Sequence, residues 1–262
     1  MLLAIDVGNT NSVFAIHDGR RFQGEWRIAT DVKRTADEYF VWLRQLMDHI
    51  GLKPSQIDDV VLSSTAAGTV FNLRVLADKY FRCRPIVVGK PECKIGIEVR
   101  VEPHVRVGAD RLVNTVSAFH TYGGDLIVVD FGTATTFDVV AEDGAYEGGI
   151  IAPGVNLSLK ALQGAAAALP EIDVTQPERV IGKETVACMQ SGIYWGYVSM
   201  IEGLCRRIMD ERGKKMKVIA TGGLSPLFAR GTDVIDEVDD SLTLRGLVTI
   251  RDLNTTDTKE TV

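Results

Sequence analysis

One pattern of residues occurs twice in this chain and limits the folds open to it. Residues 2–16 form an apolar strand that reaches Asp6, a turn of glycine, asparagine and hydroxyl residues, and a second apolar strand. Residues 126–140 repeat this order, and Asp130 lies 124 positions after Asp6. Both copies continue into an Asp-Gly pair, typical of a β-hairpin, at residues 18–19 and 143–144. We therefore predict a duplicated chain in which each half begins with a three-stranded hairpin sheet.

Further segments fit an α/β chain built from two equivalent halves. Thr35 and Glu38 form a capping-box pattern ahead of an amphipathic helix predicted to end near Ile50. A strand that runs into VVLSSTAAGT in the first half has a counterpart in KVIATGGLS, residues 217–225, in the second. The predicted halves are residues 1–118 and 119–250. The tail, residues 251–262, has almost no apolar content, and we expect it to be disordered.

Composition excludes several classes of partner. The net charge of -6 and the absence of a long basic run argue against nucleic acid and against an anionic membrane. The four cysteines form no C-x-x-C pair, which favours reduced thiols. We find neither a cleavable leader nor an apolar stretch long enough to span a membrane, so we expect a cytoplasmic protein.

The two turns suit a phosphate group. Glycine and hydroxyl residues let backbone N–H groups converge on an anion, while an aspartate beside a polyphosphate needs a bridging cation, for which Mg²⁺ is the natural choice. One such turn fits a plain hairpin equally well, but two copies and the Thr221-Gly222-Gly223 turn favour a nucleotide site. Asp6 and Asp130 are then expected to face each other across a cleft. The chain has neither a Walker A loop nor a Rossmann glycine motif.

Residues 107–119, VGADRLVNTVSAF, form a second candidate site. Gly108 and Ala109 leave room for a close backbone approach, and Asp110 and Arg111 open a predicted helix. Taken alone, Asp110 fits a helix-start carboxylate that the helix dipole favours. No other residue is a good candidate to accept the proton of a substrate hydroxyl, however, and Arg111 could bind an acidic substrate through its guanidinium.

Together these motifs resemble the type III pantothenate kinases, the CoaX family of bacterial coenzyme A synthesis. The matching stretches occur in the family's order over most of the chain: DVGNTN at Asp6, GADRLVN at Gly108, DFGTATTFD at Asp130, GGIIAPG at Gly148 and TGG at Thr221. The resemblance implies the duplicated fold of actin-like ATPases and of acetate and sugar kinases, with two ribonuclease H-like halves and a central cleft. It also implies transfer of the ATP γ-phosphoryl group to the primary hydroxyl of pantothenate.

The resemblance further implies roles for individual residues. Asp110 would be the catalytic proton acceptor, Asp6 would hold Mg²⁺ through water, and Asp130 would bind potassium or ammonium. Thr185 would contact pantothenate across the interface of a homodimer. The ATP phosphates would lie on Asp6, Val7, Gly8, Asn9, Thr10, Asn11, Ser12, Val13 and Thr133, and pantothenate on Gly108, Ala109, Asp110 and Arg111.

One position departs from the family pattern. Many members carry a tyrosine nine residues before the catalytic aspartate, where this chain has Val101, a difference that bears on pantothenate affinity or preference.

Two other functions stay open. An ATPase or phosphatase of the same fold would activate water instead of an alcohol. A catalytically weak or inactive nucleotide-binding regulator of the Bvg accessory factor type would bind ATP without turnover.

Overall fold

The chain forms two compact units, each with a five-stranded sheet. The computed structural model describes residues 1–165 and 169–255. The first unit comprises residues 1–98, residues 102–121 and the chain from Leu242 onward, and the second comprises residues 99–101 and 122–241.

The two sheets have the same strand order. In the first unit the order is β3-β2-β1-β4-β5, with β1 at Leu2–Val7, β2 at Asn11–His17, β3 at Phe22–Ala29, β4 at Asp59–Ser64 and β5 at Ile86–Val87. In the second unit it is β8-β7-β6-β9-β10, with β6 at Leu126–Phe131, β7 at Ala134–Val140, β8 at Tyr146–Pro153, β9 at Lys217–Thr221 and β10 at Glu237–Val238. In both sheets the first three strands in sequence are antiparallel and the fourth runs parallel to the first. The predicted duplication is therefore confirmed.

The register places the two aspartates equivalently. Asp6 lies beside Val13 on β2 and Ser63 on β4, while Asp130 lies beside Thr136 on β7 and Thr221 on β9. Each carboxylate therefore lies near the carboxyl end of the first strand of its sheet, flanked by an antiparallel and a parallel neighbour.

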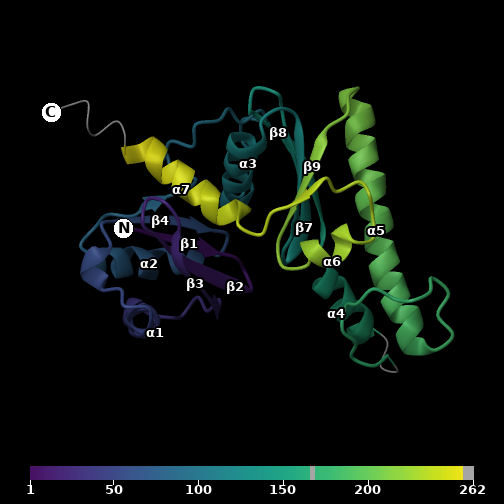
Figure 1. Cartoon of the computed structure of the whole chain (residues 1–262), viewed down its shortest axis with the longest axis horizontal. Helices are drawn as coiled ribbons and strands as arrows, with labels where there is room; N and C mark the ends of the chain where they lie inside the picture. The colour runs from purple at the N-terminus through teal and green to yellow at the C-terminus, as the bar shows by residue number, and fades with distance from the viewer. Residues whose placement is uncertain (166–168, 256–262) are drawn as a thin grey trace. The chain divides into compact units, whose positions relative to one another are not determined.

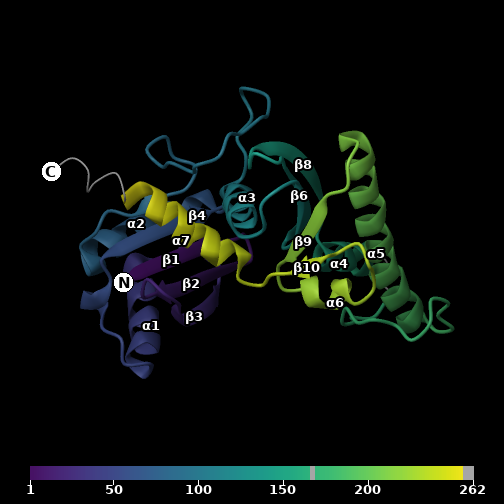
Figure 2. The ribbon, with the colours of Figure 1, turned by 45° about the horizontal axis from the view of Figure 1, so that its top comes forward.

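Helices cover both faces of the first sheet (Figures 1 and 2). Helices α1, Ala36–His49, and α2, Val70–Leu76, pack on the face that carries Leu3 and Ile5, whereas α3, Ala109–Tyr122, and α7, Leu242–Thr255, pack on the face that carries Leu2 and Ala4. Helix α2 continues as one π-helical turn, Ala77–Phe81, and short 3₁₀ turns occupy Pro54–Gln56 and Ala67–Thr69. The predicted capping box forms at the start of α1, where the Thr35 hydroxyl accepts the Glu38 N–H and the Glu38 carboxylate accepts the Thr35 N–H.

Helix α7 departs from two expectations. It begins before residue 250 yet belongs to the first unit, because Leu244, Leu247 and Ile250 are buried in the core that contains Leu2 and Ala4. It also continues to Thr255, where disorder was predicted from residue 251 onward. The Asn254 amide extends the ordered end, since it donates to the backbone oxygens of Ile250 at 2.7 Å and Lys94 at 2.8 Å. Residues 256–262 lie outside the described part of the chain.

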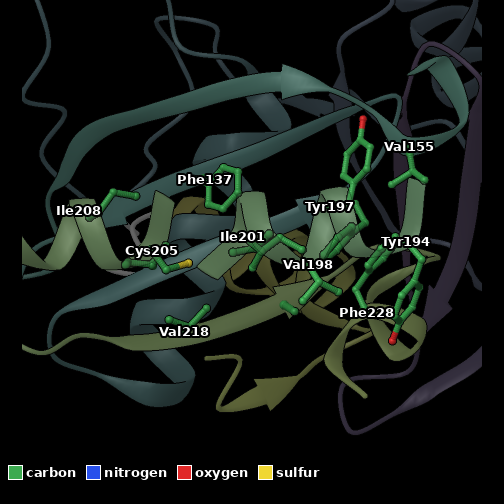
Figure 3. Packing of buried hydrophobic residues seen from close by; sticks show 14 of the residues in the cluster. Phe137, Val155, Tyr194, Tyr197, Val198, Ile201, Cys205, Ile208, Val218 and Phe228 are labelled. Carbon is green, nitrogen blue, oxygen red and sulfur yellow. The ribbon is translucent and has the colours of Figure 1, made fainter. Parts of the chain in front are cut away.

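The second unit is built around one long helix. Helix α5, Thr185–Arg212, packs a row of apolar side chains against the sheet (Figure 3). Helices α4, Val155–Ala165, and α6, Ser225–Ala229, complete the same core. In the described ranges, no helix of either unit is long and apolar enough to cross a membrane.

Candidate functional site

The first glycine and hydroxyl turn joins β1 to β2. The Gly8 N–H donates to the Asn11 carbonyl at 2.9 Å and closes the turn tightly. A Cβ atom at position 8 would lie 3.3 Å from that same carbonyl, so a side chain there would crowd the closure. Asn9, Thr10 and Asn11 are exposed at the tip, whereas Ser12 is fully buried. The exposed tip is the part of the turn that an anion could reach.

The carbonyl groups of this turn are held from behind. The Val7 carbonyl accepts the N–H of Thr65 at 2.9 Å and its hydroxyl at 3.2 Å, and the Gly8 carbonyl accepts the Thr30 hydroxyl at 2.8 Å. Carbonyl oxygens repel phosphate oxygens, so a phosphate-binding turn must direct them into the protein. The sequence did not reveal Thr30 or Thr65 as supports, because neither belongs to a local motif.

The second turn joins β6 to β7 and is one residue shorter. The Gly132 N–H donates to the Ala134 carbonyl at 3.0 Å, while Gly132 and Thr133 are exposed. Gly154 lies directly behind this turn, since a Cβ there would stand 2.2 Å from the Thr133 oxygen and 2.7 Å from the Gly132 oxygen. The turn therefore rests on backbone without room for a side chain.

Two oxygen atoms lie close to Gly222, beside Asp130. Gly222 has a φ of 90°, and a Cβ there would lie 2.8 Å from Asp130 Oδ1 and 2.7 Å from the Phe131 carbonyl oxygen. Thr221 is fixed next to it by a 2.7 Å bond from its hydroxyl to the Asp239 carbonyl. A carboxylate and a backbone carbonyl are oxygen ligands of the kind that bind potassium in proteins. The role of Asp130 as a ligand of the monovalent cation stays a prediction.

Asp6 fits a magnesium ion that keeps most of its water. Within residues 1–165 and 169–255, no three histidine, cysteine or acidic side chains gather as a metal cage. Mg²⁺ in nucleotide sites is commonly held by one or two carboxylates, water and the phosphates themselves. A single carboxylate at the end of β1 is consistent with such binding. Asp6 lies in the first unit and Asp130 in the second, and their predicted opposition across a cleft stays a prediction.

Asp110 occupies the first turn of α3 in the first unit. Its Oδ1 accepts the Arg111 N–H at 2.8 Å, and a Cβ at Gly108 would lie 2.6 Å from this oxygen. Burial raises the pKa of the Asp110 carboxyl above its ordinary value, and the N–H and the guanidinium of Arg111 oppose that rise only in part. A carboxylate that is desolvated in this way is a stronger proton acceptor than an exposed one.

The remaining predicted residues lie elsewhere in the two units. Thr185 is the exposed first residue of α5. Gly182 packs against the first turn of this helix, since a Cβ at position 182 would lie 2.5 Å from the Cys188 nitrogen. Val101 is half-buried in the short segment that groups with the second unit, next to Arg100, whose N–H donates to the Tyr146 carbonyl at 2.8 Å. The predicted site residues therefore form three separate local groups: residues 6–13, residues 108–111, and Asp130 with Thr133.

Solved structures with this duplicated architecture define its class. A ROK hexokinase from Thermus thermophilus superposes with a TM-score of 0.52 at 10% identity, covering 98% of this chain and 99% of its own. A protein described as a Baf family transcriptional activator from Campylobacter jejuni superposes with a TM-score of 0.59 at 16% identity, covering 97% and 99%. At such identities the likeness shows the fold alone. It is the actin-like ATPase and sugar-kinase fold, as the sequence predicts.

Sequence comparison identifies the family within this fold class. The family model of type III pantothenate kinases matches residues 2–207. A type III pantothenate kinase of Dinoroseobacter shibae is 60% identical over 97% of this chain and 99% of its own, and one of Paracoccus denitrificans is 59% identical over 97% and 98%. The chain belongs to the type III pantothenate kinase family.

Proposed function

We propose that this protein transfers the γ-phosphoryl group of ATP to pantothenate and forms 4'-phosphopantothenate, the first step of coenzyme A biosynthesis. Family membership over most of the chain supports this reaction. The observation that carries the mechanism is Asp110, a desolvated carboxylate with a raised pKa next to an arginine in the same unit as the first phosphate turn. Phosphoryl transfer requires chiefly alignment, charge neutralisation and a proton acceptor.

In this mechanism each local group has one task. The turn of residues 6–13 holds the ATP phosphates, and Asp6 would hold Mg²⁺ through water, which would supply positive charge at those phosphates. Thr133 adds a phosphate contact from the second turn. Asp110 accepts the proton of the pantothenate hydroxyl while the oxygen of that hydroxyl bonds to the γ-phosphorus of ATP. The bond between the γ-phosphorus and the oxygen that bridges it to the β-phosphorus breaks, and ADP is released. Residues 108–111 form the pantothenate cradle, in which Arg111 binds the substrate carboxylate.

Asp130 is assigned to the monovalent cation, potassium or ammonium. The Asp130 carboxylate and the Phe131 carbonyl, which both lie close to Gly222, support this role, since a potassium-sized cation is bound by oxygen ligands. Sodium is smaller and would be held less well by the same oxygens. We accordingly expect turnover to be lower when sodium replaces potassium in the assay.

We further propose a cytoplasmic homodimer with Thr185 at the interface between its subunits. Large apolar side chains are exposed in the second unit at Ile151, Leu157, Leu162, Val180 and Ile181. These side chains are our candidates for the surface that the two subunits share. The four cysteines are free thiols, consistent with a reducing compartment.

One assay separates this function from its rivals. Purified protein is incubated with ATP, Mg²⁺ and potassium, with and without pantothenate, and both phosphopantothenate and ADP are measured. We expect equal amounts of the two products, and only when pantothenate is present. ADP release without pantothenate would indicate an ATPase, and ATP binding without product would indicate a regulator.

A further inference from the structure

Thr30 makes three contacts with the first phosphate turn. It follows β3, and its N–H donates to the Thr10 carbonyl at 2.9 Å. Its hydroxyl donates to the Gly8 carbonyl at 2.8 Å and lies 2.8 Å from the hydroxyl of the buried Ser12. Because a hydroxyl has one proton and Thr30 gives it to Gly8, Ser12 must be the donor to Thr30. One side chain therefore links the beginning and the end of the turn.

These contacts decide which way the turn's backbone faces. The carbonyls of Gly8 and Thr10 both point at Thr30. The peptide planes that carry these two carbonyls also carry the N–H groups of Asn9 and Asn11, so holding the carbonyls toward Thr30 directs those N–H groups away from it and leaves them available to an anion. Thr30 thereby supports the arrangement that phosphate binding requires, although it is not itself at the exposed tip.

The second unit shows that the fold does not by itself demand such a residue. Gly154, 124 positions after Thr30, occupies the equivalent place, since Ala29 pairs with Asn11 as Pro153 pairs with Ala134. There the shorter turn packs directly on the glycine, and a Cβ would lie 2.2 Å from the Thr133 oxygen. The longer first turn leaves a space behind it that the Thr30 side chain fills.

We propose that Thr30 is a positioning residue of the ATP phosphate turn, a role that rests on the function proposed above. Without its hydroxyl, the Gly8 carbonyl and the Ser12 hydroxyl lose a shared partner, and the turn is free to relax away from the phosphate-binding conformation. The binding of ATP is therefore weakened, whereas the pantothenate cradle at residues 108–111 stays intact.

The test compares Thr30→Val with Thr30→Ser. Valine keeps the β-branched shape and removes the hydroxyl, whereas serine keeps the hydroxyl. For Thr30→Val we expect the KM for ATP and the Kd of Mg-ATP measured by calorimetry to rise about tenfold, the scale of one or two lost hydrogen bonds. The KM for pantothenate should change by less than about twofold, and Thr30→Ser should bind ATP nearly as well as the wild type.

Thr249→Val is the matched control. Its hydroxyl donates to the Arg245 carbonyl at 3.1 Å within α7 of the same unit, so the substitution removes a similar bond far along the chain from the turn. We expect no change in the KM for ATP. If Thr30→Val does not fold, Thr30→Ala removes the same hydroxyl without adding bulk.

Two results would overturn the proposal: wild-type affinity for Mg-ATP in a folded variant that lacks the Thr30 hydroxyl, or an equal loss in Thr30→Ser. A wild-type protein that binds Mg-ATP and forms no phosphopantothenate would contradict the proposed kinase function instead. In that case the calorimetric Kd values would still decide the role of Thr30.

Discussion

At Asp110, the proposed proton acceptor, replacement of one carboxylate oxygen by an amide nitrogen removes proton transfer and keeps the shape of the side chain. In Asp110→Asn the amide oxygen can still accept the Arg111 N–H, so the start of α3 is preserved. The amide cannot take up a proton, and we expect kcat to fall about 100-fold or more, the usual scale for removal of a general base. Steady-state kinetics and a calorimetric titration with Mg-ATP provide the measurement, and ATP affinity should be almost unchanged.

The melting temperature of Asp110→Asn serves as a control for structural damage. Because burial places the folded-state pKa of Asp110 above its unfolded value, the ionised carboxylate destabilises the fold at any pH above that raised pKa. Asparagine carries no charge, so Asp110→Asn should melt at the wild-type temperature or higher near neutral pH. A lowered Tm would attribute the loss of activity to structural damage, and undiminished kcat would remove Asp110 from the mechanism.

The pH dependence of turnover follows from the raised pKa of Asp110. Only the ionised carboxylate can accept a proton, and burial causes it to protonate at a pH at which an exposed aspartate is still charged. We expect kcat/KM for pantothenate to fall on the acidic side, starting at a higher pH than an ordinary aspartate would give. The residual activity of Asp110→Asn should lack this acidic limb, and an identical limb in both proteins would assign it to another group.

At the scale of the structural elements, the junction of β8 and α4 determines how the second turn is held. The Tyr197 hydroxyl of α5 fixes this junction, since it donates to the Pro153 carbonyl at 2.8 Å and lies 2.7 Å from the Ser158 hydroxyl. Gly154 is therefore trapped between an anchored strand end and the Thr133 carbonyl. Neither side is a flexible side chain that could give way.

Gly154→Ala should accordingly disturb the second turn. The new methyl group meets backbone oxygen at 2.2 Å, so we expect a loss of about 1–3 kcal/mol in the free energy of unfolding and a reduced affinity for ATP. Denaturant titration and the KM for ATP provide the measurements. Gly164→Ala in α4 is the control, because a Cβ there meets nothing within 4 Å and alanine favours a helix. Equal behaviour of the two variants would show that the contact behind the turn is unimportant.

Local signals explain which elements the sequence could predict. The capping box at Thr35 acts over three residues, and the two hairpins repeat at a nearly fixed offset, so both were evident from the sequence. The support that Thr30 gives to Gly8 joins residues 22 positions apart and has no local pattern. Residues 251–255, the end of helix α7, were predicted to be disordered because they are polar; packing of Leu247 and the bond to the distant Lys94 carbonyl stabilise this helix, and neither shows in the local sequence.

At the scale of the whole molecule, the exposed apolar residues of the second unit are candidates for the interface of the proposed dimer. Leu157 and Leu162 lie on α4, which packs against α5, and the Ser191 hydroxyl of α5 binds the Val180 carbonyl and holds the neighbouring Ile181 in place. Ile181 is 79% exposed. Exposed apolar side chains favour association, because burial in an interface removes their apolar surface from water.

Ile181→Asp tests this surface, because an aspartate buried in an apolar interface would be desolvated without a partner. We expect the wild type to elute as a dimer, and Ile181→Asp to shift toward the monomer in light scattering coupled to gel filtration. If Thr185 reaches pantothenate across the interface, the KM for pantothenate should rise as well, in proportion to the monomer fraction. Phe71→Asp is the control, because Phe71 is 73% exposed on α2 of the first unit and should leave the mass unchanged. A monomeric wild type, or an Ile181→Asp protein that stays dimeric at the lowest measurable concentration, would place the subunit contact elsewhere or remove it.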